Sequence, residues 1–276
     1  MADSDPLEAV TFQANSLDEV PYPEVRETLR QHTVVRIRGL FDPEEIRATK
    51  REIAARFDPA NDRKHDPRDT EIIRTNFQKL QVGCTSGMGT TRDLGRVLRM
   101  LFNPIFADDV YGMRRHFVLL ARFRNLLYEL DRDFAVFGTE EGYWTAARIH
   151  QYPRGGGFMS SHRDAFTRIV ATEAGVTYAQ PFLLMSEKGV DFQSGGAFTD
   201  LHGERVYYES GCQAGDVVAY DGQSIHGVGD IDPLEPLDMT SLSGRIVAFA
   251  ALYRHLKPGA SDYGELSRRA IEGMGH

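Results

Sequence analysis

Glycine, aspartate and proline divide the second half of this 276-residue chain into short apolar runs, and this pattern limits the fold more than any other feature. Short runs of β-forming residues with turn residues between them predict antiparallel strands. Seven such runs follow Tyr143, at 146–152, 176–185, 196–201, 205–209, 216–220, 225–229 and 245–254. About seven or eight such strands are typical of a sandwich or jelly roll, so we expect a mainly β protein.

The first 140 residues carry a different pattern, in which helices predominate. Asp42 and Pro43 are favoured at the N-cap and the first position of a helix, which we expect over 43–57. A second helical region, 109–130, has apolar residues at spacings of three and four, and this spacing predicts one face on a core. We expect these flanking helices to pack on one face of the β core.

The chain is expected to form a single domain over 1–276. We divide it into a mostly helical part at 1–140, a β core at 141–257 and a C-terminal tail at 258–276. The helical part is joined too closely to the β runs to form a domain of its own. Within it, 65–92 is polar and rich in glycine, and we expect this segment to be a mobile loop that covers a site.

Composition and charge disfavour several classes of protein. The formal net charge is −8 and the pI is about 5.6, so we expect no nucleic-acid partner. No apolar run approaches the roughly 18 to 20 residues of a membrane span, and the N-terminus does not resemble a signal peptide. The two cysteines, Cys84 and Cys212, lie far apart and support neither a disulfide framework nor a thiolate zinc site. We therefore expect a soluble, cytoplasmic protein.

Two of the nine histidines have an acidic residue two positions further on. His202 and Glu204 lie at an expected hairpin tip, where polar residues are common. His162 and Asp164 instead follow a strand and a glycine-rich bend. Because alternate residues of an extended segment point the same way, this second pair can bind one metal ion.

His226 offers a third ligand, just after another strand and a tight turn. Two histidines and one carboxylate on one face form the facial triad that holds non-haem Fe(II) and leaves positions free for a cosubstrate and O₂. Zinc hydrolases can also use two histidines and one carboxylate. The triad alone therefore leaves the identity of the metal open.

Arg245 begins the last apolar run, and two interpretations of it stay open. An arginine at the start of a strand often marks an end that faces solvent. Alternatively, its planar guanidinium binds a carboxylate through two parallel hydrogen bonds inside the core. The second interpretation suits an Fe(II) enzyme that uses 2-oxoglutarate, and it favours that chemistry.

With these residues in place, the sequence over 146–254 resembles the Fe(II)/2-oxoglutarate-dependent dioxygenases, in the prolyl-hydroxylase-like and phytanoyl-CoA-hydroxylase-like style. The resemblance rests on three segments and on Arg245. These segments are Tyr152, Gly157 and Phe158 with His162-x-Asp164; Gly195-Gly196-Ala-Phe198; and Gly215 to His226-Gly-Val. The resemblance implies a double-stranded β-helix, or jelly-roll, core packed against the N-terminal helices.

The resemblance also implies roles for individual residues. His162, Asp164 and His226 would bind iron, Arg245 would bind the far carboxylate of 2-oxoglutarate, and Tyr152 would be a further contact to it. One departure is the 18 residues between His226 and Arg245, a longer spacing than the family commonly has. The cofactors implied are Fe(II), 2-oxoglutarate as cosubstrate and O₂.

The implied activity is oxidation of a C–H bond of a polar small molecule, by hydroxylation or oxidative cyclisation, with release of succinate and CO₂. We expect the substrate to belong to specialised, natural-product metabolism. Candidate substrate contacts are Trp144, which precedes the ligand-bearing strand, Arg148, which shares the parity of His150, and Arg74, near the expected loop. We expect neither a nucleic-acid nor a membrane partner.

Two alternatives remain at this point. A cupin-like, metal-dependent isomerase or hydrolase would keep the triad without using 2-oxoglutarate, and its Arg245 would face solvent. A non-catalytic β-sandwich binding protein would contain the histidines as ordinary polar residues.

Overall fold

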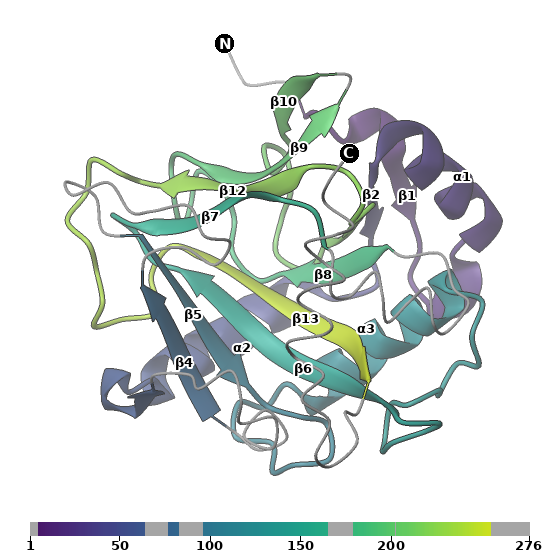
Figure 1. The fold of residues 1–276 in the computed structure, drawn as a ribbon, viewed down its shortest axis with the longest axis horizontal. Coiled ribbons are helices and arrows are strands. Elements are labelled where there is room, and N and C mark those ends of the chain that lie inside the picture. The colour runs from purple at the N-terminus through teal and green to yellow at the C-terminus, as the bar shows by residue number, and fades with distance from the viewer. Residues whose placement is uncertain (1–4, 64–76, 83–95, 165–178, 202, 255–276) are drawn as a thin grey trace, which may run out of the picture.

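The strands of the computed structural model form one continuous hydrogen-bonded system, described for residues 5–63, 77–82, 96–164, 179–201 and 203–254 (Figure 1). The strands within these residues are β1 (Thr11–Gln13), β2 (Val34–Arg38), β3 (Asp62–Arg63), β4 (Phe77–Val82), β5 (Val97–Phe102), β6 (Tyr143–Tyr152), β7 (Gly157–His162), β8 (Gln180–Leu184), β9 (Gly196–Leu201), β10 (Glu204–Tyr207), β11 (Val217–Tyr220), β12 (His226–Ile231) and β13 (Arg245–Arg254). The α-helices are α1 (Tyr22–His32), α2 (Pro43–Arg56) and α3 (Arg114–Leu127), and the 3₁₀ turns are η1 (Glu8–Val10), η2 (Leu17–Glu19) and η3 (Pro59–Asn61). The protein is mainly β, as predicted.

The last eight strands form two antiparallel sheets of four strands each. We call β11-β8-β13-β6 the major sheet and β7-β12-β9-β10 the minor sheet. The chain passes repeatedly from one sheet to the other, and only β9 and β10 follow each other within the same sheet. This strand order is consistent with a jelly-roll core.

Further strands extend the major sheet at both edges. At one edge β2 pairs with β11 and β1 pairs with β2, while at the other edge β5 pairs with β6 and β4 pairs with β5. The prediction that 1–140 is mostly helical was therefore wrong for β4 and β5. All six residues of β5 are buried, and periodicity cannot assign a short buried run to a helix or a strand. Residues 77–82 of the expected loop at 65–92 are β4, whereas most of that loop and the tail at 258–276 lie outside the described residues.

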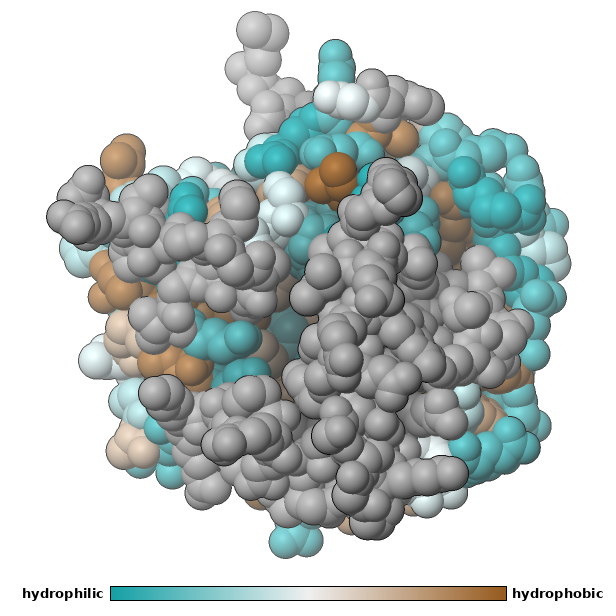
Figure 2. Space-filling view, in the orientation of Figure 1, coloured by the Kyte–Doolittle hydropathy of each residue, from teal (hydrophilic) through white to brown (hydrophobic). Residues whose placement is uncertain are grey.

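The helices lie on the outside of the sheets. α3 packs against β13 and β8 of the major sheet, and α1 packs against β2 and α3. Figure 2 shows hydrophilic residues over the outer side of α1, at the right of the view. The start of α3 is later than predicted because Asp109 accepts a hydrogen bond from the backbone N–H of Met113 and so caps the helix from outside (2.9 Å). In the described part of the chain, no helix combines the length and the apolar character needed to cross a membrane.

Hydrogen bonds of Arg124 connect α3 to the major sheet. Its guanidinium is fully buried and donates to the backbone oxygen of Ala250 on β13 (2.7 Å) and to the hydroxyl of Thr145 on β6 (3.2 Å). Burial lowers the pKa of Arg124 to about 10, so the side chain remains positively charged at neutral pH. The helix is thus held to two strands that also reach the interior of the jelly roll.

The long connection between β12 and β13 is fixed near its end by side chains of other strands. Gln151 on β6 donates to the backbone oxygens of Ser241 and Ser243, each at 2.9 Å, and Arg99 on β5 donates to that of Met239 at 3.0 Å. Gly244 then has a φ of +84°, and a Cβ atom there would lie 2.3 Å from the backbone oxygen of Tyr152. A glycine is therefore required just before β13 begins.

Candidate active site

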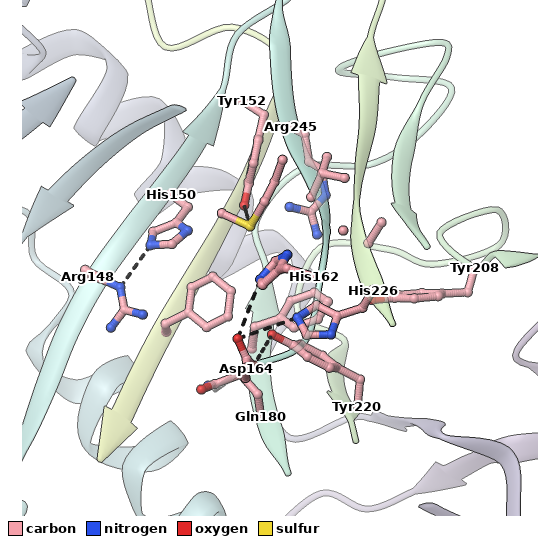
Figure 3. Close-up of a pocket in the computed structure, with 16 residues that line it drawn as sticks. Arg148, His150, Tyr152, His162, Asp164, Gln180, Tyr208, Tyr220, His226 and Arg245 are labelled. Atoms are coloured by element: carbon pink, nitrogen blue, oxygen red, sulfur yellow. Dashed lines mark hydrogen bonds and ion pairs between the residues drawn. The ribbon is translucent and has the colours of Figure 1, made fainter. Parts of the chain in front are cut away.

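A pocket lies between the major and minor sheets (Figure 3). Its cavity has a volume of about 120 Å³. Both sheets contribute to its walls, and the residues that line it are Arg148, His150, Tyr152, Met159, His162, Asp164, Gln180, Phe182, Ala197, Tyr208, Tyr220, His226, Gly227, Val228, Arg245 and Phe249. The pocket therefore contains three histidines, one carboxylate and two arginines among mostly apolar and aromatic side chains.

His162, Asp164 and His226 converge on one point of this pocket (Figure 3). His162 ends β7 and His226 begins β12, and the antiparallel pairing of these strands brings the two residues opposite each other. The Nε2 atom of each histidine lies 3.6 Å from Oδ1 of Asp164, and the candidate ligand atoms all lie within 4.8 Å of one another. This triad is placed to bind a metal ion.

The backbone fixes which nitrogen of each histidine faces the carboxylate. Nδ1 of His162 lies 2.8 Å from the backbone oxygen of Ser160, and Nδ1 of His226 lies 2.9 Å from that of Ser224. Because a carbonyl oxygen only accepts hydrogen bonds, each neutral imidazole carries its hydrogen on Nδ1 and has its lone pair on Nε2. Nε2 of His226 is buried and has no hydrogen-bond partner among the described residues. This is the state in which histidine binds a metal.

Asp164 is oriented by a tyrosine of the major sheet. The hydroxyl of Tyr220 donates a hydrogen bond of 3.3 Å to Oδ2 of Asp164. The tyrosine thus contacts the oxygen that does not face the histidine nitrogens, and this contact orients the carboxylate.

Close approach of three strands positions His226. A Cβ atom at the next residue, Gly227, would lie 2.7 Å from the ring of Phe198 on β9 and 2.8 Å from the backbone oxygen of Met159 on β7. Any larger residue at 227 would push β12 away from its neighbours. The glycine after His226 therefore contributes to the geometry of the triad.

Arg245 does not face solvent, so that interpretation of the sequence was wrong. The side chain is 2% exposed and lies in the pocket wall, but it already binds a carboxylate, that of Glu209. Nε lies 2.9 Å from both carboxylate oxygens, and Nη2 lies 2.7 Å from Oε1. Burial lowers the pKa of Arg245, but the charge of Glu209 more than offsets burial, and the pKa is raised.

Sequence reasoning missed Glu209. This residue follows β10 and is 2% exposed, and its carboxylate also accepts a hydrogen bond from the backbone N–H of Ala197 (2.9 Å). No local pattern connects Glu209 with Arg245, which lies 36 residues further along the chain. Only the order of strands brings the two residues together.

Tyr152 lies beside Arg245 in the pocket wall. The guanidinium carbon of Arg245 is 5.0 Å from the centroid of the Tyr152 ring, and the hydroxyl of Tyr152 is 4.0 Å from Sδ of Met159. Burial raises the pKa of Tyr152 to about 12. The hydroxyl therefore stays protonated and can donate a hydrogen bond to a ligand.

Arg148 and His150 lie next to each other on β6 and line the same pocket (Figure 3). Nε of Arg148 donates to Nε2 of His150 over 2.9 Å, so the hydrogen of the imidazole is on Nδ1. That Nδ1 atom is buried, and no described residue is its hydrogen-bond partner. Burial and the positive charges of Arg148, Arg245 and Lys79 hold the pKa of His150 well below its usual value, so the ring is neutral.

Comparison with known proteins gives likenesses of structure only. No family model and no curated protein matches the chain. An oxidoreductase of the 2OG-Fe(II) oxygenase family from Burkholderia pseudomallei is 14% identical, with a TM-score of 0.48 over 89% of this chain and 95% of that one. A Pseudomonas putida prolyl-4-hydroxylase is 15% identical, with a TM-score of 0.47 over 85% and 99%. EctD from S. alaskensis with bound Fe is 14% identical, with a TM-score of 0.49 over 91% and 82%.

At these identities and TM-scores, the chemistry of the pocket has to be inferred from its own residues.

The remaining sequence candidates lie apart from the triad or outside the described residues. Trp144 is 2% exposed and does not line the described pocket. It packs edge-on against Tyr253, with 5.6 Å between ring centroids, and against Phe106 at 6.1 Å. Arg74 and His202 belong to the residues that are not described.

Proposed function

We propose that this protein is a non-haem Fe(II)/2-oxoglutarate-dependent oxygenase that oxidises a C–H bond of a polar small molecule. The oxidation is a hydroxylation or an oxidative cyclisation, and the substrate belongs to specialised, natural-product metabolism. Iron bound with 2-oxoglutarate would supply the oxidation, in which O₂ converts 2-oxoglutarate to succinate and CO₂ and takes two electrons from the substrate.

One observation carries the proposal. Three acceptor atoms, one on each of His162, Asp164 and His226, face one another, and the backbone carbonyls hold the imidazole hydrogens on the far side of each ring. A carboxylate next to two nitrogen lone pairs is electrostatically unfavourable without a cation between them. Two histidines and one carboxylate are the ligands that non-haem Fe(II) takes while keeping positions free for a cosubstrate and O₂.

The chain's own residues prepare the site for these ligands. The backbone oxygens of Ser160 and Ser224 orient the two imidazoles, and the Tyr220 hydroxyl orients the carboxylate. Such outer contacts raise the basicity of the ligands and fix their direction. Aromatic and aliphatic side chains line much of the rest of the pocket, and such surroundings strengthen electrostatic interactions.

For 2-oxoglutarate, we propose that Arg245 and Tyr152 contact the carboxylate remote from the metal. The contacts of Arg245 with Glu209 use Nε and Nη2, so Nη1 is the donor that can serve a ligand in the pocket. The hydroxyl of Tyr152 adds a second donor. The cosubstrate would then share the guanidinium with Glu209.

The pairing with Glu209 also favours a second candidate, a cupin-like metal-dependent isomerase or hydrolase. In that case the arginine has a structural role, because its charge is already neutralised within the wall. The burial of Arg245 argues against the form of this alternative in which the arginine faces solvent.

The test is an anaerobic titration of the Fe(II)-loaded protein with 2-oxoglutarate, followed by the weak visible charge-transfer band of the chelate. The proposal expects the band in the wild type, its loss in His226→Ala and a much higher 2-oxoglutarate requirement in Arg245→Ala. His32→Ala is the matched control, because His32 is exposed at the end of α1. Bound iron without a band in the wild type would overturn the proposal in favour of the cupin-like enzyme.

A further inference from the structure

The buried arginines of the described chain differ in how their charge is balanced. Three of them have a carboxylate oxygen at 2.7 Å, in the pairs Arg36–Asp5, Arg99–Asp62 and Arg245–Glu209. Arg124 has no carboxylate, but its donors reach the neutral oxygens of Ala250, Thr145 and Asn125. Arg148 fits neither pattern.

Arg148 is 9% exposed, and no described carboxylate contacts it. Its one short hydrogen bond uses Nε, and Nη1 has only a long contact of 3.5 Å to the backbone oxygen of Ala146. The guanidinium lies among aromatic rings, with centroids 5.4 to 5.9 Å away, those of Phe102, Phe249 and Tyr253. These rings remove water from the charge without neutralising it, and an unbalanced buried charge is costly.

The surroundings of Arg148 add positive charge. Lys79 on β4 is in register with Met100, which in turn pairs with His150. Burial, together with the charge of Arg148, lowers the pKa of Lys79 to about 8. No described acidic side chain forms an ion pair with this lysine, whose ammonium is still largely protonated at neutral pH. This wall of the pocket therefore attracts an anion.

His150 provides a second, independent sign of a ligand. Its Nδ1–H is a buried donor in a residue that lines the pocket, and it has no partner in the part of the chain that the structure describes. Buried donors are nearly always satisfied in folded proteins, by protein atoms, by water or by a ligand. The same ring accepts the hydrogen bond from Nε of Arg148 and thereby leaves the two Nη groups for another partner.

We propose that the substrate carries a carboxylate, which Arg148 binds through its two Nη groups on the β6 wall, apart from the metal triad (Figure 3). This inference rests on the proposed function and names the class of its substrate. A planar carboxylate matches the edge of a guanidinium through two parallel hydrogen bonds. Arg245 is not assigned to the substrate, because the proposed function assigns its remaining donor, Nη1, to 2-oxoglutarate. His150 is a positioning residue that holds the guanidinium and offers Nδ1 to the same substrate.

The test compares a carboxylate with a neutral amide of nearly the same shape and with a phosphate. Ni(II)-loaded protein, with and without 2-oxoglutarate, is titrated calorimetrically with benzoate, benzamide and phenyl phosphate. We expect benzoate to bind at least about tenfold more tightly than benzamide, the effect expected of a charged hydrogen-bonded pair. Arg148→Met should abolish this preference, Arg148→Lys should retain part of it, and Arg115→Met, at an exposed arginine on α3, should leave it unchanged.

A second variant keeps the test decisive if Arg148→Met does not fold. Lys79→Met leaves Arg148 intact and removes one neighbouring charge, so it should weaken benzoate binding about two- to fivefold, because a charge without direct contact has a small effect. An unchanged affinity for benzoate in this variant would contradict the inference that the positive charges of Arg148 and Lys79 attract the anion.

Three results would overturn the inference. The first is equal binding of benzoate and benzamide in the wild type. The second is tighter binding of phenyl phosphate than of benzoate, which would replace the carboxylate by a phosphate. The third is loss of the 2-oxoglutarate charge-transfer band in Arg148→Met, which would make Arg148 the anchor of the cosubstrate. Failure of the oxygenase proposal is distinguishable, because the wild type would then lack the band while its preference for benzoate persisted.

Discussion

The two sheets around the pocket contribute different chemistry to it. The minor sheet supplies both histidines of the triad, and each is oriented by a carbonyl oxygen two residues earlier in the chain. The major sheet supplies Arg148 and Arg245. The partner of Arg245 lies 36 residues away, and Arg148 has no acidic partner among the described residues. Local chain geometry thus orients each imidazole of the triad, whereas the neutralisation of Arg245 depends on long-range packing.

Burial explains this difference. All ten residues of β6 are buried, as are those of β8 and β11, because the pocket lies on one side of the major sheet and α3 packs on the other. The minor sheet includes exposed positions, notably on β10. A charge on the major sheet is therefore withdrawn from water and requires a partner, either within the protein or on a ligand.

The largest effect is expected from removing a ligand on the minor sheet. His226→Ala should lower the affinity for Fe(II) or Ni(II) by more than the roughly 10- to 100-fold lost when only an outer contact is removed. Equilibrium dialysis of the metal measures this effect, with His32→Ala as the control. Retention of wild-type affinity would show that the triad is not the metal site. The minor sheet would then not differ from the major sheet by supplying metal ligands.

For the major sheet, the largest expected effect is a loss of stability when Arg245 on β13 loses its partner Glu209. Glu209→Ala leaves the charge of Arg245 buried without a partner, and breaking such a pair costs about 3–5 kcal/mol in the free energy of unfolding. Urea unfolding monitored by circular dichroism measures the loss. Asp133→Ala breaks the more exposed pair with Arg122 and should cost no more than about 1 kcal/mol. If both variants lost the same free energy of unfolding, burial of the ion pair would not determine its contribution to stability.

A smaller effect is expected at Tyr220, which lies on the major sheet but contacts Asp164 of the triad. Tyr220→Phe removes the hydrogen bond to Asp164 and should lower metal affinity about tenfold, at the lower end for an outer contact because the bond is 3.3 Å long. Tyr207→Phe on the minor sheet is the control, since Tyr207 does not line the described pocket. Dialysis of Ni(II) distinguishes the two variants, and unchanged affinity in Tyr220→Phe would separate the tyrosine from the metal site.

The smallest effect is expected at Trp144. Trp144→Phe should leave the affinities for metal and 2-oxoglutarate within about twofold of the wild type. The indole packs on Tyr253, whose ring lies 5.4 Å from Arg148, and it does not line the pocket that contains the triad and Arg245. Dialysis and the charge-transfer titration measure both affinities. A larger loss of either would show that the pocket extends along β6 beyond Arg148.

The sequence predicted local features better than long-range ones. The sequence predicts the short β runs and the His162-x-Asp164 pair, because these features depend on residues only a few positions apart. Strand β7 was read as part of a glycine-rich bend, and its sequence, Gly157–His162, lacks a clear apolar alternation. The ion pair between Glu209 and Arg245 could not be predicted, because it depends on which strands become neighbours.

The anchored end of the β12–β13 connection explains the unusual spacing noted in the sequence. Arg99 and Gln151 hold the segment at Met239, Ser241 and Ser243, while Leu234 earlier in the same connection is 99% exposed. An insertion next to Leu234 would therefore extend into solvent and leave in place the arginine that begins β13. The outer part of this connection can therefore differ in length while the wall of the pocket that Arg245 forms stays the same.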